Sequence, residues 1–276
     1  MRILISCDME GISGIVAWAQ VTPGQSEYLR GCQLMVGDVN AAAQAAFQAG
    51  AAEVTVSDAH WYARNIWLGD LDERVVLNSG SPAPISMLQG IAGPQPYDAV
   101  ICVGYHARAG TWNGVLSHTW STAVAGVWLN GRQVGEIGIN AAVAGHFGTP
   151  IVALTGDSAA CDEARELLGP ALETATVKVG LGHTAASCLP LVESRAQIAT
   201  AVRRALGRLA QATAPQPYVV DRPVQLAVEY LRPNLADRSS WVPGARRVTG
   251  TRLEYEAPDM LAALRAFRSM TTLATE

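Results

Sequence analysis

Short apolar runs that end in polar residues or glycine recur along the chain and predict buried β-strands. The clearest runs are residues 2–7, 53–57, 99–104 and 150–155. Shorter strand-like segments lie at residues 75–77 and 177–179. Strands of a parallel sheet are covered on both faces, so their sequences are continuous apolar runs. We therefore expect a mostly parallel central sheet.

Segments with helical spacing of apolar residues separate these runs. In the longest, residues 26–49, apolar side chains recur every three or four positions, and Gly50 follows as a stop signal. Further helices are expected over residues 85–91, 140–147, 158–168 and 197–212. The alternation of strands and helices predicts an α/β fold in which helices flank the central sheet.

The last quarter of the chain has a different pattern. Residues 214–217, with the sequence Ala-Pro-Gln-Pro, form the best candidate linker because proline ends the preceding helix. Strand-like stretches at residues 224–229 and 252–255 and a helix from Pro258 follow. We therefore expect an α/β core over residues 1–213 and a smaller C-terminal α+β lobe over residues 214–276. The alternative is that this lobe is an integral part of a single domain.

Charge and composition argue against several classes of partner. The chain has 16% charged residues and a net charge of −4 without a basic block, so the positive field that nucleic-acid backbones require is missing. No apolar stretch approaches the roughly twenty residues that span a bilayer, and the first residues do not resemble a signal peptide. We expect no nucleic-acid or membrane partner and a cytoplasmic location. The five cysteines lack CxxC spacing and are expected to be reduced thiols.

Side chains that bind metals follow three of the predicted strands. Asp8 and Glu10 come after the first, Asp58 and His60 after the second, and His106 after the strand that closes at residues 104–105. Ligands of open parallel sheets gather at the carboxyl ends of the strands, so these side chains are expected to converge.

A carboxylate from another segment can join this group. The Asn130–Gly131 pair lies between two apolar-patterned arms and predicts a β-hairpin, with Glu136 following closely on its second arm. Two histidines with three carboxylates suit a pair of divalent metals, with Asp8 as the natural bridge. The alternative is an ordinary loop in which Asp8 caps a turn and Glu10 is solvated.

His118 lies beyond a glycine-containing loop and is a candidate for proton transfer rather than metal binding. His146 and His183 have no strand-end context and are interpreted as structural. A group of tryptophans near the candidate residues fits core or subunit-interface packing, or else pocket lining; these are Trp61, Trp67, Trp112, Trp120 and Trp128. Nucleotide-binding glycine motifs and the GxSxG elbow of serine hydrolases are absent from the sequence.

Several of these motifs occur together, and in this order, in one known family. The segment Asp8-Met9-Glu10-Gly11-Ile12-Ser13-Gly14 resembles the zinc-dependent D-aminopeptidase family (DppA type). The resemblance continues through residues 58–60, 104–109, 117–118, 130–131, 135–140 and 156–157, and on to Lys178, residues 221–223 and residues 257–260. It therefore covers most of the chain.

This resemblance implies a dinuclear zinc site with two Zn²⁺ ions per subunit, whose ligands are Asp8, Glu10, His60, His106 and Glu136. In it, Asp8 bridges the metals, Glu10 and His60 bind one, His106 and Glu136 bind the other, and His118 lies beside them. It also implies a ring-shaped homodecamer. We expect hydrolysis of short peptides, with a preference for an N-terminal D-amino acid and with His118 as acid/base. The alternatives are a dinuclear hydrolase of a non-peptide amide and a non-catalytic metal-binding scaffold.

Overall fold

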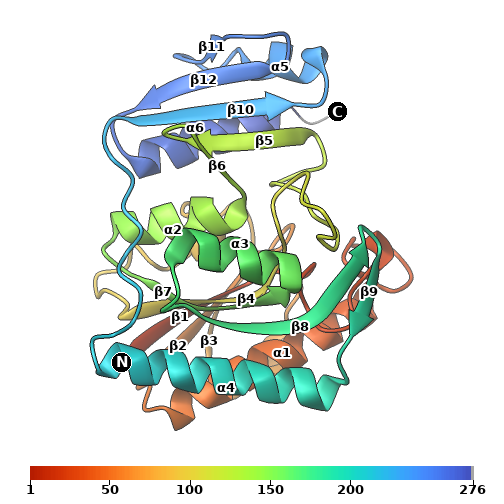
Figure 1. Cartoon of the computed structure of the whole chain (residues 1–276), viewed down its shortest axis with the longest axis vertical. Helices are drawn as coiled ribbons and strands as arrows, with labels where there is room; N and C mark the ends of the chain where they lie inside the picture. The colour runs from red at the N-terminus through yellow and green to blue at the C-terminus, as the bar shows by residue number, and fades with distance from the viewer. Residues whose placement is uncertain (275–276) are drawn as a thin grey trace.

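A seven-stranded sheet forms the centre of the fold in the computed structural model, which describes residues 1–274 (Figure 1). The strand order is β3-β2-β1-β4-β7-β8-β9, and all neighbours from β3 to β8 are parallel, whereas β9 is antiparallel to β8. The strands are β1 (Arg2–Cys7), β2 (Glu53–Asp58), β3 (Val76–Asn78), β4 (Ala99–Tyr105), β7 (Ile151–Asp157), β8 (Glu173–Gly182) and β9 (Ala185–Cys188). The predicted mostly parallel sheet is confirmed.

The central strands are buried on both faces, as their apolar runs predict. Every residue of β4 and of β7 is buried, and only the first residue of β1 is partly exposed. The chain proceeds from β1 to β2 on one side and later to β4 on the other, so the order reverses between β1 and β4. In open α/β sheets such a reversal opens a crevice at the carboxyl ends of the strands, where ligands bind.

Two pairs of helices cover the two faces of this sheet (Figure 1). Helices α1 (Tyr28–Gln48) and α4 (Leu191–Ala210) pack together on one face, and α2 (Glu136–His146) and α3 (Ser158–Leu168) lie on the other. Helix α1 buries Cys32, Met35 and Val39 on one stripe. It ends before Gly50, whose φ of +90° suits the left-handed conformation that stops a helix.

A second sheet of five strands lies beyond α2 and α6 (Figure 1). Its order is β11-β12-β10-β5-β6, and all its pairs are antiparallel. The elements are β5 (Val124–Leu129), β6 (Arg132–Val134), β10 (Val224–Tyr230), α5 (Pro233–Ser239), β11 (Arg246–Arg247), β12 (Arg252–Ala257) and α6 (Met260–Leu273). The predicted hairpin at residues 130–131 is confirmed, but it pairs with β10, so this sheet combines residues 124–134 with the C-terminal segment. The division at residue 213 stays a prediction.

Other differences from the sequence-based expectations are local. Residues 85–91 contain a single 3₁₀ turn, η3 (Ser86–Leu88), and two more such turns are η1 (Trp18–Gln20) and η2 (Leu68–Asp70). Helix α4 begins six residues earlier than expected, with Pro190 as its N-cap residue. Within residues 1–274, no helix has the length and apolar character needed to cross a membrane.

Candidate metal centre

The loop after β1 carries the first two candidate ligands. Asp8 and Glu10 are only 3% and 2% exposed, so both carboxylates are buried. The backbone N–H groups of Asp8 and Gly11 donate to the carbonyl oxygens of Val103 and Gly104 at 2.9 and 2.8 Å, which ties this loop to the end of β4. A Cβ at Gly11 would lie 2.0 Å from the carbonyl oxygen of Tyr105, so only glycine allows this approach.

His60 enters the site from the loop after β2. The Asp58 carboxylate accepts the backbone N–H groups of Asn65 and Ile66, and the Asn65 amide donates to the His60 carbonyl oxygen at 2.7 Å. The His60 Nε2–H donates to the Val21 carbonyl oxygen at 2.8 Å. Nδ1 therefore faces the site, 3.0 Å from Asp8 Oδ1 and 3.2 Å from Glu10 Oε2.

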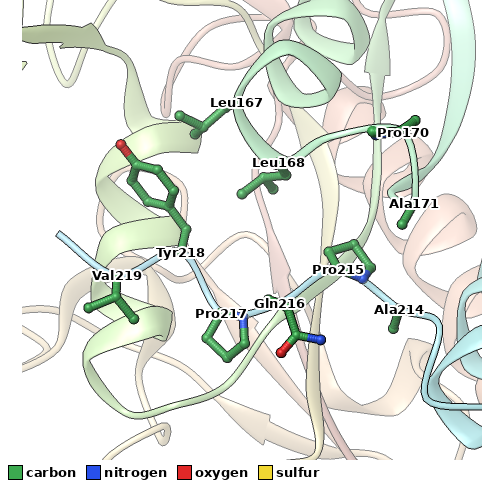
Figure 2. Close-up of a pocket in the computed structure, with 10 residues that line it drawn as sticks. All are labelled: Leu167, Leu168, Pro170, Ala171, Ala214, Pro215, Gln216, Pro217, Tyr218 and Val219. Carbon is green, nitrogen blue, oxygen red and sulfur yellow. The ribbon is translucent and has the colours of Figure 1, made fainter.

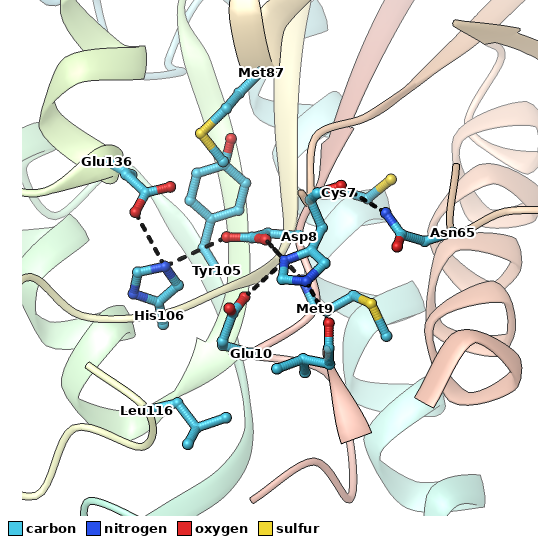
Figure 3. A network of polar contacts seen from close by, with 12 residues as sticks. Cys7, Asp8, Met9, Glu10, Asn65, Met87, Tyr105, His106, Leu116 and Glu136 are labelled. Atoms are coloured by element: carbon cyan, nitrogen blue, oxygen red, sulfur yellow. Dashed lines mark hydrogen bonds and ion pairs between the residues drawn. The ribbon is translucent and has the colours of Figure 1, made fainter. Parts of the chain in front are cut away.

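His106 and Glu136 approach Asp8 from the opposite side. The His106 Nδ1–H donates to the Ala107 carbonyl oxygen at 3.0 Å, which leaves Nε2 facing the site. Nε2 lies 3.3 Å from Glu136 Oε1 and 3.5 Å from Asp8 Oδ2 (Figure 3). Glu136 follows the second arm of the hairpin closely, as expected: β6 ends at Val134, and Glu136 is the first residue of α2.

The structure thus brings all five predicted ligands together around Asp8. Two groups of side chains have ligand atoms within 4.8 Å of one another and could each hold a metal ion: Asp8, Glu10 and His60, and His106, His118 and Glu136. The two oxygens of Asp8 face different histidines: Oδ1 lies toward His60, and Oδ2 lies toward His106 (Figure 3). A carboxylate so placed can bridge two cations.

The carboxylates and histidines of the site shift one another's pKa values. Burial and repulsion from Glu10 raise the pKa of Asp8 to about 7. Burial opposes ionisation of Glu10 as well, yet His60 holds the Glu10 pKa well below its usual value. Glu10 and Glu136 raise the pKa values of His60 and His106 well above normal, although burial opposes this. Three carboxylates are therefore crowded into a buried volume where positive charge, here that of His60 and His106, offsets their repulsion.

Two buried polar atoms give a more direct test of the fit. Glu10 Oε2 and His106 Nε2 have ion-pair contacts of 3.2–3.5 Å, but neither atom has a hydrogen bond of acceptable geometry among the described residues. Buried polar atoms are nearly always paired, so an unpaired one requires an explanation such as an ion. The other nitrogen of each histidine donates to a backbone carbonyl, which is how metal-binding histidines are usually oriented. The imidazole and carboxylate donors fit zinc.

His118 lies against the second group of ligands. Its ring stacks on His106 with centroids 4.1 Å apart and an angle of 12° between the planes. The His118 Nδ1–H donates to the Leu116 carbonyl oxygen at 2.8 Å, and Nε2 lies 3.9 Å from Glu136 Oε1. Burial and the neighbouring His106 lower the pKa of His118 below 6.5. The ring is therefore neutral at neutral pH and presents a free Nε2.

Asp157 and His183, to which the sequence assigned no role at the site, hold the His118 loop in place. The Asp157 carboxylate accepts the Val115 N–H at 2.6 Å and also caps α3 through the Ala160 N–H at 2.7 Å. The Leu116 N–H donates to the His183 carbonyl oxygen at 2.7 Å. Asp157 ends a buried strand, and this position could have indicated that its carboxylate binds a neighbouring loop. The residues around Asp157 in the sequence do not indicate which loop that is.

The tryptophan loops and the remaining histidines lie outside the ligand set. Trp61, Trp67 and Trp112 are exposed, whereas Trp120 packs edge-on against Phe267. His146 ends α2 and His183 is exposed on the β8–β9 turn. All five cysteines are free, and only Cys188 is exposed.

A groove elsewhere on the surface does not provide a competing site. It has a volume of about 610 Å³ and lies between the end of α3 and residues 214–219 (Figure 2). Its walls are mainly apolar side chains such as Leu167, Leu168 and Pro215 (Figure 2). None of its lining residues is a histidine, cysteine or carboxylate, so it lacks the groups that hydrolysis or metal binding needs.

Comparisons with known proteins agree with this geometry. The sequence model of the D-aminopeptidase family (peptidase M55) matches residues 1–269. The chain belongs to this family. It is 35% identical to the D-aminopeptidase of Bacillus subtilis (strain 168) over 278 aligned residues, which cover 99% of this chain and 98% of that protein.

A solved member of the D-aminopeptidase family has the same fold. It is the Zn-dependent D-aminopeptidase DppA from Bacillus subtilis, described as a self-compartmentalizing protease. The TM-score is 0.94 at 34% identity, and the superposition covers 99% of this chain and 98% of DppA. The family resemblance inferred from the sequence motifs is confirmed.

Proposed function

We propose that the chain is a zinc-dependent aminopeptidase that removes N-terminal D-amino acids from short peptides, with two Zn²⁺ ions per subunit. The observation that carries the proposal is that Asp8, a member of one candidate metal-binding group, directs Oδ1 toward His60 of that group and Oδ2 toward His106 of the other. The family and the zinc dependence of the related Bacillus subtilis enzyme support it.

Each ligand has a role in this proposal. Asp8 would hold both ions, Glu10 and His60 would complete the ligands of one, and His106 and Glu136 would complete the ligands of the other. The ions, when bound, would polarise the scissile carbonyl and activate water for attack. The three carboxylates among the five predicted ligands, Asp8, Glu10 and Glu136, would offset most of the charge of two dications.

His118 supplies proton transfer. With Nδ1–H held by the Leu116 carbonyl, Nε2 is the atom that can accept a proton from the attacking water and deliver it to the leaving amine. The lowered pKa keeps Nε2 free to accept that proton at neutral pH. The stacking on His106 fixes the ring plane beside the metal ligands.

The assembly and location of the protein are further parts of the proposal. We propose a homodecamer that encloses its active sites. The description of DppA as self-compartmentalizing supports this. Exposed aromatic side chains such as Trp67 and Trp112, 70% and 87% exposed, also support it, because aromatic residues are typical of interfaces. Light scattering should give about ten times the monomer mass of 29.1 kDa; a fully active monomer would contradict it. The cytoplasm stays the predicted location.

One experiment tests the enzymatic proposal. Zinc content and turnover of D-Ala and L-Ala amides and dipeptides should be measured on the purified protein, on Asp8→Ala, and on Glu73→Ala as an exposed-carboxylate control. We expect Asp8→Ala to lose most zinc and activity while Glu73→Ala retains both. Full zinc occupancy in Asp8→Ala refutes the ligand set. Zinc without turnover favours a scaffold, and turnover of a non-peptide amide alone favours the amidohydrolase.

A further inference from the structure

The sequence contains one lysine, Lys178, whereas all the other residues that contribute to its Lys and Arg count are arginines. Its side chain is fully buried, although lysine is rarely buried without a partner. It lies on β8 where the pairing with β7 shifts: Thr176 pairs with Gly156 and Lys178 with Asp157, so Val177 is an extra residue. Such a bulge redirects a neighbouring side chain.

The ammonium group of Lys178 is surrounded by backbone carbonyls of one loop. Nζ donates to the carbonyl oxygens of Glu10, Ile12 and Ile15 at 2.5, 2.9 and 2.6 Å. These three acceptors use all three donors of an ammonium ion. Among residues 1–274 no carboxylate forms an ion pair with Nζ, so carbonyl dipoles provide its direct partners.

The loop that wraps around Lys178 is residues 8–15, which we call the metal loop because it carries Asp8 and Glu10. A buried anion, Asp38 of α1, holds the same loop by accepting the Ser13 N–H at 2.9 Å. The metal loop is therefore fixed by a buried cation through its carbonyls and by a buried carboxylate through an amide. The Glu10 carbonyl is bound to Lys178, while its side chain faces His60.

We propose that Lys178 is a positioning residue that folds the metal loop around its ammonium group and so holds Glu10 in place before any metal binds. This inference rests on the proposed metal site at Asp8, Glu10 and His60. The ammonium group does not touch a metal or substrate; it acts through the backbone of the loop.

Arginine should not replace this lysine. The three carbonyl oxygens surround a single nitrogen, which suits a compact ammonium ion, whereas a guanidinium spreads its donors over a planar fork. Lys178→Arg therefore keeps the charge and loses the geometry, and Lys178→Met keeps the approximate length and loses the donors. Val177→Ala is the matched control, because Val177 is equally buried on the same strand and belongs to the apolar core.

The test combines zinc titration with amide hydrogen exchange of the metal-free protein. We expect Lys178→Met and Lys178→Arg to bind one zinc equivalent about 10–100-fold more weakly, with the group containing His106 and Glu136 less affected. Without metal, the Gly11 and Ser13 amides should exchange faster in both variants than in Val177→Ala. Unchanged zinc affinity and unchanged loop protection in Lys178→Met would overturn the proposal.

A measurement on the wild-type protein decides the question if these variants do not fold. In the metal-free wild type, the Gly11 and Ser13 amides should already be protected, because their acceptors are the Gly104 carbonyl and Asp38. If they exchange as in an open chain until zinc is added, the metal orders the loop and the proposal is wrong. If the wild type binds no zinc, the proposed function is contradicted instead. Amide protection of the metal loop is measured without metal, so it tests the role of Lys178 separately from that result.

Discussion

Replacing His118 by alanine separates proton transfer from metal binding, because its ring lies within reach of both roles. The Nε2 atom is 3.9 Å from Glu136 Oε1, close enough to belong to the second group of metal-binding side chains. The ring also stacks on His106 and has a lowered pKa, which suits a neutral base beside the ligands. We expect His118→Ala to depress turnover and to retain zinc.

The size of the effect follows from the role assigned to Nε2. A positioned acid/base group contributes typically about 10²–10⁴-fold to a rate, which corresponds to about 3–5 kcal/mol of activation free energy. Loss of a ligand gives a different signature, because it weakens retention of an ion as well as turnover. The five predicted ligands remain in place in His118→Ala, so zinc content should stay near that of the wild type.

The assay requires zinc content and kcat on the same preparations. His106→Ala serves as the ligand-loss control, and His146→Ala, at the end of α2 and outside both metal groups, serves as the neutral control. If His118→Ala loses an ion as His106→Ala does, His118 is a ligand. If it retains near-normal turnover, the acid/base mechanism is wrong.

Three further predictions follow from the geometry. Because burial and His106 lower the pKa of His118, its neutral form persists to lower pH, and the acid limb of kcat/KM should have its midpoint below 6.5; a midpoint above 6.5 would contradict this. His60 faces the site through Nδ1, so His60→Asn, whose carbonyl oxygen lies near the Nδ1 position, should retain more zinc than His60→Gln, as metal analysis would show; equal losses would argue against this orientation. An amine-directed reagent should modify the N-terminal amine of the native protein and reach Lys178 only after denaturation, as peptide mass spectrometry would show; labelling of native Lys178 would mean that it is accessible.

The parts of the fold that the sequence predicts are those whose burial is uniform. Strands β4 and β7 are buried at every position, so their apolar runs are unambiguous. The short strand β9 is mostly exposed and β11 is fully exposed, and such strands leave no apolar pattern to detect. The start of α2 was missed for another reason: its first turn follows the hairpin directly, with only Gly135 between β6 and the helix.

The candidate ligands could be predicted because they follow strand ends and because the family motif contains them. The groups that hold them could not, since their partners are distant in the chain. Asp58 could be seen at the end of β2, but its pairing with Asn65 depends on how the next loop turns. Lys178 is 168 residues from Glu10, and it follows the bulge on β8, which no local sequence pattern indicates.

The orientation of the two ligand histidines shows how the backbone prepares this site. His60 presents Nδ1 because Val21 takes its Nε2–H, and His106 presents Nε2 because the Ala107 carbonyl takes its Nδ1–H. In each ring a backbone carbonyl oxygen fixes which nitrogen faces the site. His60 Nδ1 and His106 Nε2 therefore face Asp8 independently of any ion. Asp8 then carries one oxygen toward each ring, and its two-sided position is a consequence of where β2 and β4 end on either side of β1. We therefore propose that Asp8 is the bridging carboxylate, because the order of the strands places it between His60 and His106.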